Sequence, residues 1–516
     1  MVQRPDYERH KRKLRRNRRG GRPEQPASRR SVLGQVYFLA QPLSGWRFPP
    51  SGFSFLSLRS LRSMFLFQSL RLLRRVCAIA LPGLVGCLLA QGQSARTPVI
   101  MISIDGLNPH YVLRAEDHAA GIPFLRSFLT NGTYAQSVIN VVPTITFPNH
   151  VTLITGTLPE QHGIFNNMLQ DPNSNLIAAP MEYGNAIRVP TLWEAAQSAG
   201  LKTASVFWPV SLGARGIDYN IPPIHTQGTP ADHYLLEAVS RPDGFLASVE
   251  KQIGVYSPEE DEDDFVTRAA IAVIRGQRPY LLTVHLGNLD DAQHHSGPDS
   301  QEAFAALEKI DGQVRQIADA ERAVYPDADI VIVSDHGFFP VSHVINLNAE
   351  FVRHGLITLS KTGHIASWKV FSWTGGGSAA VILHNPDDRE TAEKVRQILD
   401  GLEKDPASGI AQILSKQEAK AFGGTPETEF LIDCRPGFYV GRGLTTPLIT
   451  DASQKGTHGY LPVHPELQSS FFIMGPRIAR NRNLGVIDMR QIAPTIAKEL
   501  EARMPSATMP VLPVDR

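Results

Sequence analysis

Six acidic and imidazole side chains along the chain stand beside glycines or at the ends of apolar runs. They are Asp105, Asp290, His294, Asp335, His336 and His458. Carboxylate and imidazole ligands without thiolate are typical of zinc in a catalytic site, and suit manganese or iron less well. Asp290 and His294 are four residues apart, so one helical turn can direct both side chains at a single ion. The set therefore predicts chemistry based on divalent metals.

Each of these residues also has a simpler interpretation. An aspartate at a strand end is commonly a helix cap, and an isolated Asp-His-Gly or Thr-His-Gly is a weak signal. The joint occurrence of all six is what favours a metal site. His295 and His343 are interpreted as surface or loop residues.

A threonine hydroxyl lies within the segment 143–156, which reads PTITFPNHVTLITG. Pro148 is tolerated in the first turn of a helix, and Val151 and Ile154 suit one buried face. Thr146 then comes just before a helix N-terminus, where the positive end of the helix dipole favours an anion. Its hydroxyl becomes a nucleophile only with help from a base or a metal. The alternative is that Thr146 is only a helix cap.

Apolar runs that read as buried strands precede three of the candidate ligands. Residues 98–104 lead to Asp105, residues 280–286 lead to Asp290, and residues 329–334 lead to Asp335. Helical patterns alternate with these runs, which predicts an α/β fold with a mostly parallel central sheet covered by helices on both faces. Sites in such sheets form at the carboxyl ends of strands.

The domain organisation expected from the 516 residues is one large catalytic domain over 97–505 with a short tail, 506–516. Residues 340–455 read as an irregular insertion near the site, although residues 379–383 could rejoin the central sheet. Ser257 and Pro258 read as the cap and first position of a helix.

Charge is unevenly distributed along the chain. Residues 1–75 contain 18 Lys and Arg against 3 Asp and Glu, and the remainder contains 33 basic against 47 acidic residues. Residues 1–63 form a basic extension whose block 4–30 is too poor in apolar residues to bury a core, so we expect it to be disordered. One interpretation is a nucleic-acid-binding tail. The interpretation we favour is that the true start is Met64, and we expect no nucleic-acid partner.

Residues 64–96 have the pattern of an export signal. Basic residues precede a 15-residue apolar stretch, 76–90, and small residues follow it. This stretch is shorter than the roughly 20 residues of a membrane span. We therefore expect a periplasmic or secreted protein. Residues 84–87 also resemble a lipoprotein cleavage box, which would make Cys87 a lipid anchor, and residues 28–33 resemble a twin-arginine motif.

Cysteine content limits the remaining chemistry. Of the three cysteines, Cys77 and Cys87 lie in the expected signal, which leaves only Cys434 after cleavage. The processed chain then has no intramolecular disulfide, and thiolate metal sites are not expected.

The order of the motifs resembles the nucleotide pyrophosphatase/phosphodiesterase family of the alkaline phosphatase superfamily. The motifs are Ser-Ile-Asp-Gly at 103–106, Pro-Thr-Ile-Thr-Phe-Pro-Asn-His at 143–150, Asp-x3-His-x2-Gly-Pro from 290, Ser-Asp-His-Gly at 334–337 and Thr-His-Gly-Tyr at 457–460. The resemblance covers roughly residues 97–500. It implies two Zn²⁺ ions, one bound by Asp290, His294 and His458, the other by Asp105, Asp335, His336 and Thr146.

The resemblance also implies roles for two residues near the threonine. Asn167 would donate a hydrogen bond to a phosphate oxygen, and Phe147 would form a wall for the leaving group or base. The chain departs from the family at Leu461-Pro462, where many members have Asp-Asn. No ligand is lost there, but a substrate preference cannot be carried over from the eukaryotic members.

The function expected from these features is hydrolysis of phosphodiester or pyrophosphate bonds through a phosphothreonine intermediate. The substrate would be a small phosphodiester or a nucleotide. Alternatives on the same scaffold are a phosphomonoesterase, a phosphonate hydrolase, a sulfatase or a phospholipid head-group phosphodiesterase. Thr146-Phe147-Pro148-Asn149 lacks the Cys/Ser-x-Pro-x-Arg motif of a sulfatase. A secreted binding protein without catalysis is the alternative from another class.

Overall fold

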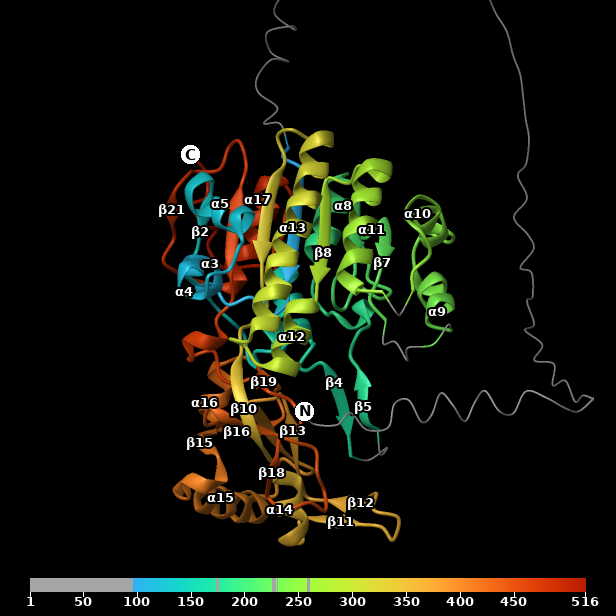
Figure 1. Ribbon diagram of the computed structural model, residues 1–516. Helices are drawn as coiled ribbons and strands as arrows, with labels where there is room; N and C mark the ends of the chain where they lie inside the picture. Colours follow the sequence, from blue (N-terminus) through green and yellow to red (C-terminus); the bar gives the residue numbers. More distant parts are fainter. Residues whose placement is uncertain (1–95, 173–175, 225–228, 230, 258–259) are drawn as a thin grey trace, which may run out of the picture. The chain divides into compact units, whose positions relative to one another are not determined.

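The computed structural model describes residues 96–172, 176–224, 229, 231–257 and 260–516 (Figure 1). The predicted basic extension, the export signal and Cys87 lie outside the described residues. The described residues all belong to one compact unit. Among the described helices, none is both long and apolar enough to cross a membrane.

The central sheet of the described chain has eight strands. Their order is β21 (Arg482–Asn483), β2 (Thr133–Tyr134), β20 (Phe471–Met474), β9 (Asp329–Val333), β1 (Val99–Ile104), β8 (Leu281–Leu286), β6 (Thr203–Val206) and β7 (Tyr219–Ile221). From β9 to β7 all neighbours are parallel, whereas β20 is antiparallel to both β9 and β2. The mostly parallel sheet predicted from the sequence is confirmed.

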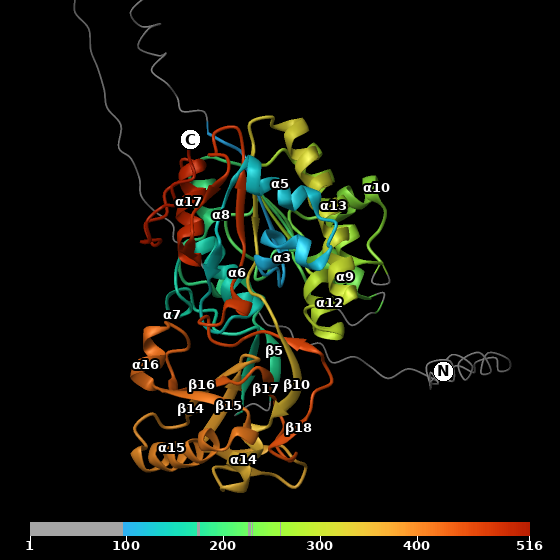
Figure 2. The same cartoon turned by 60° about the vertical axis from the view of Figure 1, so that its left-hand side comes forward.

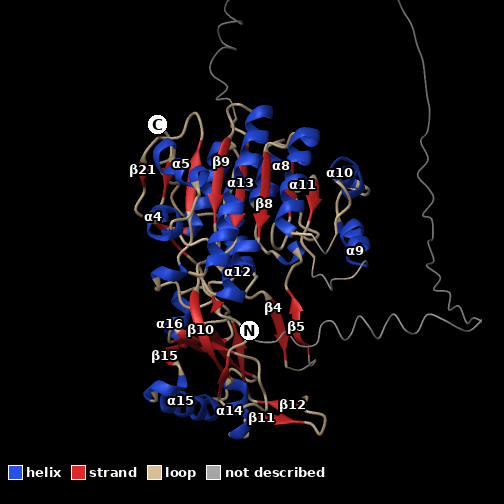
Figure 3. Ribbon diagram, viewed as in Figure 1, coloured by secondary structure: helices blue, strands red, loops and turns tan. Residues whose placement is uncertain are grey.

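Helices cover both faces of this sheet (Figures 1 and 3). Ile100, Ile102 and Ile104 of β1 pack with α5 (Pro123–Asn131), α11 (Glu262–Gln277) and α13 (Gln301–Val324). Val99 and Met101 pack on the opposite face with α6 (Thr146–Thr155), α8 (Leu192–Ser198) and α17 (Ile492–Glu499). Successive side chains of a strand point to opposite faces, so a strand buried on both sides is apolar throughout, as β1 is.

Two helices begin at residues other than those predicted. The side chain of Asp261 accepts a hydrogen bond from the Asp264 N–H (3.2 Å) and caps α11 at Glu262, so Ser257 does not cap this helix. Helix α6 begins at Thr146, two residues before Pro148. Thr146 is therefore the first helical residue and not the residue before the helix.

Further short elements complete the described fold. The helices are α3 (His110–Leu113), α4 (Ala115–His118), α7 (Pro159–His162), α9 (Ala231–Val239), α10 (Phe245–Ile253) and α12 (Asn288–Ser296). The strand pairs are β3 (Ser137–Ile139) with β22 (Val486–Asp488), β4 (Met168–Asp171) with β5 (Leu176–Pro180), and β11 (Ile357–Leu359) with β12 (Ile365–Trp368).

The segment between β9 and β20 forms its own sheets (Figure 2). One sheet joins β10 (Phe339–Ile345) to β17 (Gly437–Val440), β18 (Ile449–Asp451) and β19 (Gly456–Thr457). The other has the order β13 (Val370–Thr374), β14 (Ser378–Leu383), β16 (Thr428–Cys434), β15 (Ile410–Ser415). Helices α14 (Leu347–Arg353), α15 (Arg389–Lys404) and α16 (Lys416–Ala421) complete it.

Two expectations for this segment are wrong. It is not irregular, because Phe351 of α14, Leu399 of α15 and Ile432 of β16 belong to a buried core of its own. Residues 379–383 lie in β14, which pairs with β13 and β16 and does not rejoin the central sheet. The pairing of β14 with β16 joins segments that α15, β15 and α16 separate in the sequence, so a local pattern could not reveal it.

Candidate active site

Three neighbouring parallel strands bring the candidate ligands to one edge of the central sheet. In the register of these strands, Ser103 of β1 lies beside both His285 of β8 and Val333 of β9. Asp105 follows β1, and Asp335 and His336 follow β9. Helix α12, which carries Asp290 and His294, begins two residues after β8 ends. The carboxyl ends of parallel strands meet, so residues distant in sequence converge here.

The first group of side chains surrounds Nε2 of His336. Asp335 Oδ2 is 3.0 Å from this nitrogen, Asp105 Oδ1 is 3.4 Å from it, and Thr146 Oγ1 is 3.5 Å from it. Asp335 and His336 are fully buried, and Asp105 is nearly so. Within the described residues, Asp105 Oδ1 and Asp335 Oδ2 accept no hydrogen bond. One N–H cannot satisfy three oxygens, so this group suits a shared cation.

The pKa values of the carboxyl groups here also favour a bound cation. Burial, together with the neighbouring carboxylates of Asp335 and Asp290, raises the pKa of Asp105 well above its usual value. Burial also disfavours the charged form of Asp335, but the neighbouring histidines, His336 foremost, together outweigh it and lower the pKa of Asp335. Burial raises the pKa of Asp290. Carboxylates this close to one another resist ionising together, and a divalent cation would remove that resistance.

The second group consists of Asp290, His294 and His458. His294 Nδ1 lies 2.9 Å from the Gly456 carbonyl oxygen, and His458 Nδ1 lies 3.3 Å from that of Thr144. A carbonyl oxygen only accepts, so both Nδ1 atoms carry the proton and both Nε2 atoms present lone pairs. Hydrogen bonds of this kind commonly orient metal-binding histidines.

The free nitrogens of the second group point at one another and at a carboxylate. The two Nε2 atoms are 3.2 Å apart, although neither has a proton to donate to the other. Asp290 Oδ2 lies 3.5 Å from His294 Nε2, and Asp290 Oδ1 lies 3.7 Å from His458 Nε2. Burial, with His336 and His294 nearby, lowers the pKa of His458 well below its usual value and keeps the ring neutral. The arrangement suits a second cation.

The two groups adjoin through a pair of stacked rings. The His336 and His458 ring centroids are 3.7 Å apart with an angle of 12° between the ring planes. Ligand atoms of Asp290, His336 and His458 also lie within 4.8 Å of one another. The site can therefore hold two neighbouring cations.

A cleft opens from the second group. It has a volume of about 470 Å³. Its lining includes His294, His458, Asn167, Tyr439, Arg442 and Gln454. Asn167 Oδ1 accepts a hydrogen bond from the Phe147 N–H (2.7 Å), which leaves its Nδ2 free to donate. The cleft thus joins the second group to the loop that follows α7 and to β17.

A family model described as type I phosphodiesterase/nucleotide pyrophosphatase matches residues 99–461, which include every candidate ligand. The chain belongs to this family.

Known members of the family match only in part. Human ectonucleotide pyrophosphatase/phosphodiesterase family member 1 is 28% identical over 248 residues, 46% of this chain and 23% of that protein. An uncharacterized pyrophosphatase/phosphodiesterase from Schizosaccharomyces pombe is 26% identical over 293 residues, 54% of this chain and 52% of its own length. The matches thus span from about a quarter to about half of these relatives.

Solved structures agree in fold. Murine ectonucleotide pyrophosphatase/phosphodiesterase 5 superposes with a TM-score of 0.57 at 20% identity, covering 80% of this chain and 96% of that one. An inactive variant of the same murine protein in complex with AMP also superposes with a TM-score of 0.57, at 18% identity. The alkaline phosphatase-like α/β fold expected from the sequence is confirmed.

The fold places most, but not all, of the predicted site residues together. The six acidic and imidazole residues lie in the two groups, with Thr146 beside the first and Asn167 in the cleft. Phe147 packs part of its ring against the apolar core under α6, and it does not line the cleft. Its role as a wall of the substrate site stays a prediction, as do the roles of the other residues.

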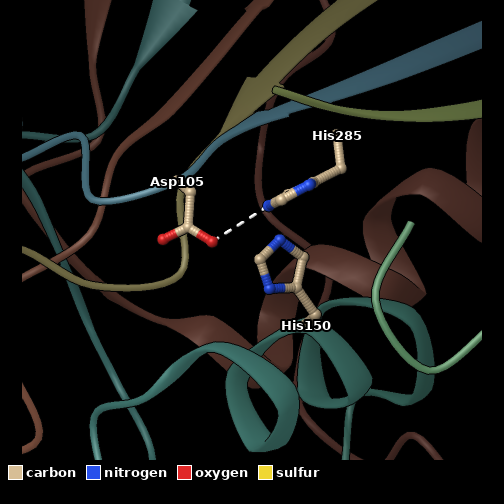
Figure 4. A group of neighbouring side chains, drawn as sticks. All are labelled: Asp105, His150 and His285. Atoms are coloured by element: carbon tan, nitrogen blue, oxygen red, sulfur yellow. Dashed lines mark hydrogen bonds and ion pairs between the residues drawn. The ribbon is translucent and has the colours of Figure 1, made fainter. Parts of the chain in front are cut away.

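Two histidines that the sequence analysis did not assign also belong to the site (Figure 4). His285 Nε2 lies 2.9 Å from Asp105 Oδ2. His150 Nδ1 lies 2.8 Å from the Thr146 carbonyl oxygen, and its Nε2 lies 2.8 Å from Ser103 Oγ. The available signals were the place of His150 at the end of the motif 143–150 and a histidine in the mostly apolar strand β8.

Asp105, His150 and His285 together resemble a third ligand set. However, both ring nitrogens of His150 are already hydrogen-bonded, Nδ1 as donor to a carbonyl and Nε2 as acceptor from a hydroxyl. Burial lowers the pKa of His150 and keeps this neutral tautomer. The three side chains are therefore better explained as a hydrogen-bonded support for Asp105 and Thr146 than as a further metal site.

Proposed function

We propose that this chain hydrolyses phosphodiester or pyrophosphate bonds of small substrates such as nucleotides, with Thr146 as nucleophile and two Zn²⁺ ions as cofactors. The observation that carries the proposal is the position of the Thr146 hydroxyl, 3.5 Å from His336 Nε2 at the junction of the two groups. Membership of a family named for this chemistry supports it.

The residues present suit the two cations. Asp105, Asp335, His336 and Thr146 would bind one, and Asp290, His294 and His458 the other. The orphaned oxygens of Asp105, Asp290 and Asp335 and the two outward lone pairs of His294 and His458 support this assignment. Oxygen and imidazole donors without thiolate fit zinc in a catalytic site. When bound, the ions would supply Lewis-acid charge to the hydroxyl and to the leaving oxygen.

Thr146 is prepared for attack by its own helix. It is the first residue of α6, so its oxygen lies at the positive end of the helix dipole. His150, one turn later, donates to the Thr146 carbonyl and sets the backbone of this residue. Attack forms the Oγ–P bond while the bond from phosphorus to the leaving oxygen breaks. The phosphothreonine that results keeps the second ester group of the substrate.

Asn167 and water complete the reaction. The free Nδ2 of Asn167 would donate to a non-bridging phosphate oxygen, because its Oδ1 is already held by the Phe147 N–H. A water molecule then attacks phosphorus, the Oγ–P bond breaks, and Thr146 regains a proton. Preorganised donors of this kind stabilise charge that develops in the transition state.

The test is a panel of nucleotide and lipid diesters with a phosphomonoester as control. Purified, zinc-loaded protein should cleave at least one diester or pyrophosphate far faster than the monoester. Acid quenching during turnover should trap the substrate's phosphoryl group on a peptide that contains Thr146. Turnover of the monoester alone, or a labelled residue other than Thr146, would contradict the proposal.

We also propose that the protein is exported. The apolar stretch 76–90 with its basic flank supports this, as do relatives named as ectoenzymes. In one version of this proposal, the signal is cleaved before Cys87 and this cysteine carries a lipid anchor. Terminal sequencing of the exported protein should place the new N-terminus near residue 96, or at Cys87 if it is lipidated. Retention of residues 4–30 would instead favour a functional basic tail.

A further inference from the structure

One arginine lies in the cleft that opens from the second ligand group. Arg442 follows β17 and lines the same cleft as His294 and His458. Throughout the part of the chain that the structure describes, its guanidinium makes no hydrogen bond or ion pair. The Arg442 side chain is exposed to solvent, and partial desolvation lowers its pKa with no carboxylate acting against this. Arginine stays protonated at neutral pH, so this side chain adds a positive charge to the lining of the cleft.

The backbone around Arg442 is closely packed. The Gly441 N–H donates to the Ile345 carbonyl (2.9 Å), which ties the loop to β10. A Cβ on Gly441 would lie 2.3 Å from Val344 Cγ1, and a Cβ on Gly443 would lie 2.5 Å from Asn346 Oδ1. Both contacts are with side-chain atoms, so a larger residue at either position would displace a neighbouring side chain, and the arginine is presented on a loop that lies against a strand.

The geometry of the displacement indicates which part of a substrate meets this arginine. The nucleophile and the leaving group lie on opposite sides of phosphorus in an in-line reaction. Thr146 belongs to the first group, whereas the cleft opens from His294 and His458 of the second. The leaving group therefore extends into the cleft, toward Arg442.

We propose that Arg442 is a specificity-determining residue that binds a phosphate or diphosphate leaving group. This rests on the proposed function above and narrows it, because it favours pyrophosphate substrates over diesters whose leaving group has no phosphate. Arginine suits this role, since its planar fork of donors matches phosphate oxygens in a bidentate contact. Tyr439 and Gln454 in the same lining add further polar groups.

The kinetic test compares two substrates that share one nucleoside monophosphate. One is a nucleoside triphosphate, with diphosphate as leaving group, and the other is the nitrophenyl ester of the same monophosphate. Arg442→Gln should lower the ratio of kcat/KM for the triphosphate to kcat/KM for the ester at least tenfold, and Arg442→Lys should lower it less. A ratio that Arg442→Gln leaves unchanged would overturn the proposal.

A matched control is Arg396→Gln. Arg396 lies on α15, where it pairs with Asp400 at 2.6 Å outside the cleft. This variant should keep the wild-type ratio. A fall in the ratio equal to that of Arg442→Gln would show a non-specific charge effect and would also count against the proposal.

A binding measurement separates this inference from the proposed function. Calorimetry with inorganic pyrophosphate, on zinc-loaded protein, should show affinity in the wild type and at least tenfold weaker binding in Arg442→Gln. Equal affinities, or no binding to the wild type, would overturn the role of Arg442. Tight, Arg442-dependent binding without hydrolysis of either nucleotide would support Arg442 and refute the proposed activity instead.

Discussion

At the scale of single residues, the side chains after Thr146 explain why its position is so well defined. Asn149 Nδ2 donates to the carbonyls of Pro143 (2.9 Å) and Ile145 (2.8 Å), and its Oδ1 accepts from the Val141 N–H (3.1 Å). His150 donates to the Thr146 carbonyl. These buried side chains satisfy the backbone of the loop that enters α6. The hydroxyl is thus held toward His336 by groups that take no part in the chemistry themselves.

Replacing Thr146 tests the nucleophile. Thr146→Ala should lower kcat by several orders of magnitude while both metals stay bound, since only binding and electrostatic catalysis remain. Thr146→Ser should keep part of the activity, because serine offers the same hydroxyl with less restricted rotation. Steady-state rates, zinc content and melting temperature are the measurements.

A purely structural role for Thr146 predicts a different result. A helix cap lost to alanine costs ~1 kcal/mol of stability and leaves activity intact below the melting temperature. The structure argues against this role, because Ile145 occupies the cap position and Thr146 Oγ1 lies near His336. Near wild-type hydrolysis by zinc-loaded Thr146→Ala would show that the mechanism is wrong.

His285 should act as a positioning residue for Asp105. Its Nε2 lies 2.9 Å from Asp105 Oδ2, on the far side of the carboxylate from the oxygen near His336. His285→Ala should weaken zinc affinity by roughly 10–100-fold, the usual effect of removing a partner of a metal ligand. His285→Gln, which can still donate a hydrogen bond, should recover part of the affinity. Competition titration with a zinc-binding dye gives the value.

An affinity for zinc that is the same in wild type and His285→Ala would refute this role. His343→Ala serves as control. His343 lies in β10, outside both groups of candidate ligands, and hydrogen-bonds Ser342.

At the scale of elements, α13 places an ionisable side chain in the core. Glu321 near its end is buried, and its Oε2 has no hydrogen-bond partner among the described residues. Burial raises the pKa of Glu321 to about 8. The folded chain therefore keeps this proton at pH values where the unfolded chain, with a pKa near 4.5, has lost it. Stability must fall as the pH rises from about 5 to 8, since folding then requires proton uptake.

Glu321→Gln should remove this pH dependence. Between pH 5.5 and 8.5 the melting temperature of the wild type should fall more than that of the variant. The corresponding difference in the free energy of unfolding is on the order of 1–3 kcal/mol. The exposed Glu302 at the start of α13 supplies the control variant Glu302→Gln. If the melting temperatures of Glu321→Gln and the wild type depend on pH in the same way across this range, Glu321 is ionised in the folded protein.

The elements also show how far the sequence alone could lead. Apolar runs followed by Asp105 and Asp335 predicted both the strands and their common edge, because parallel strands of a covered sheet are apolar throughout. The sheets between β9 and β20 could not be predicted, since their registers join segments as distant as β10 and β17. His285 was missed for a related reason. Its partner Asp105 follows β1, and the sequence around β8 does not show that β1 lies beside it.

At the scale of the whole molecule, the two ligand groups join segments from the beginning to the end of the family match. Asp105 follows β1, Asp290 and His294 lie on α12, and His458 follows β19. Without cations, the buried carboxylates of Asp105 and Asp335 and the partly buried carboxylate of Asp290 remain close together at the junction of these elements. Bound metal should therefore stabilise the folded chain as well as enable catalysis, because a ligand that binds only the native state shifts the folding equilibrium.

Metal removal is the prediction that tests this view. The purified chain should contain two zinc ions, and a chelator should abolish activity and lower the melting temperature by roughly 5–10 °C, as expected for a ligand present well above its dissociation constant. Zinc should restore both. His294→Ala should lose one of the two ions, because it removes a nitrogen from the second group. The adjacent His295→Ala should keep both, since His295 is exposed and its Nδ1 hydrogen-bonds to the Asp291 carbonyl (2.7 Å). Elemental analysis that finds one ion or none in active wild-type protein, or two in His294→Ala, would refute the two-metal assignment.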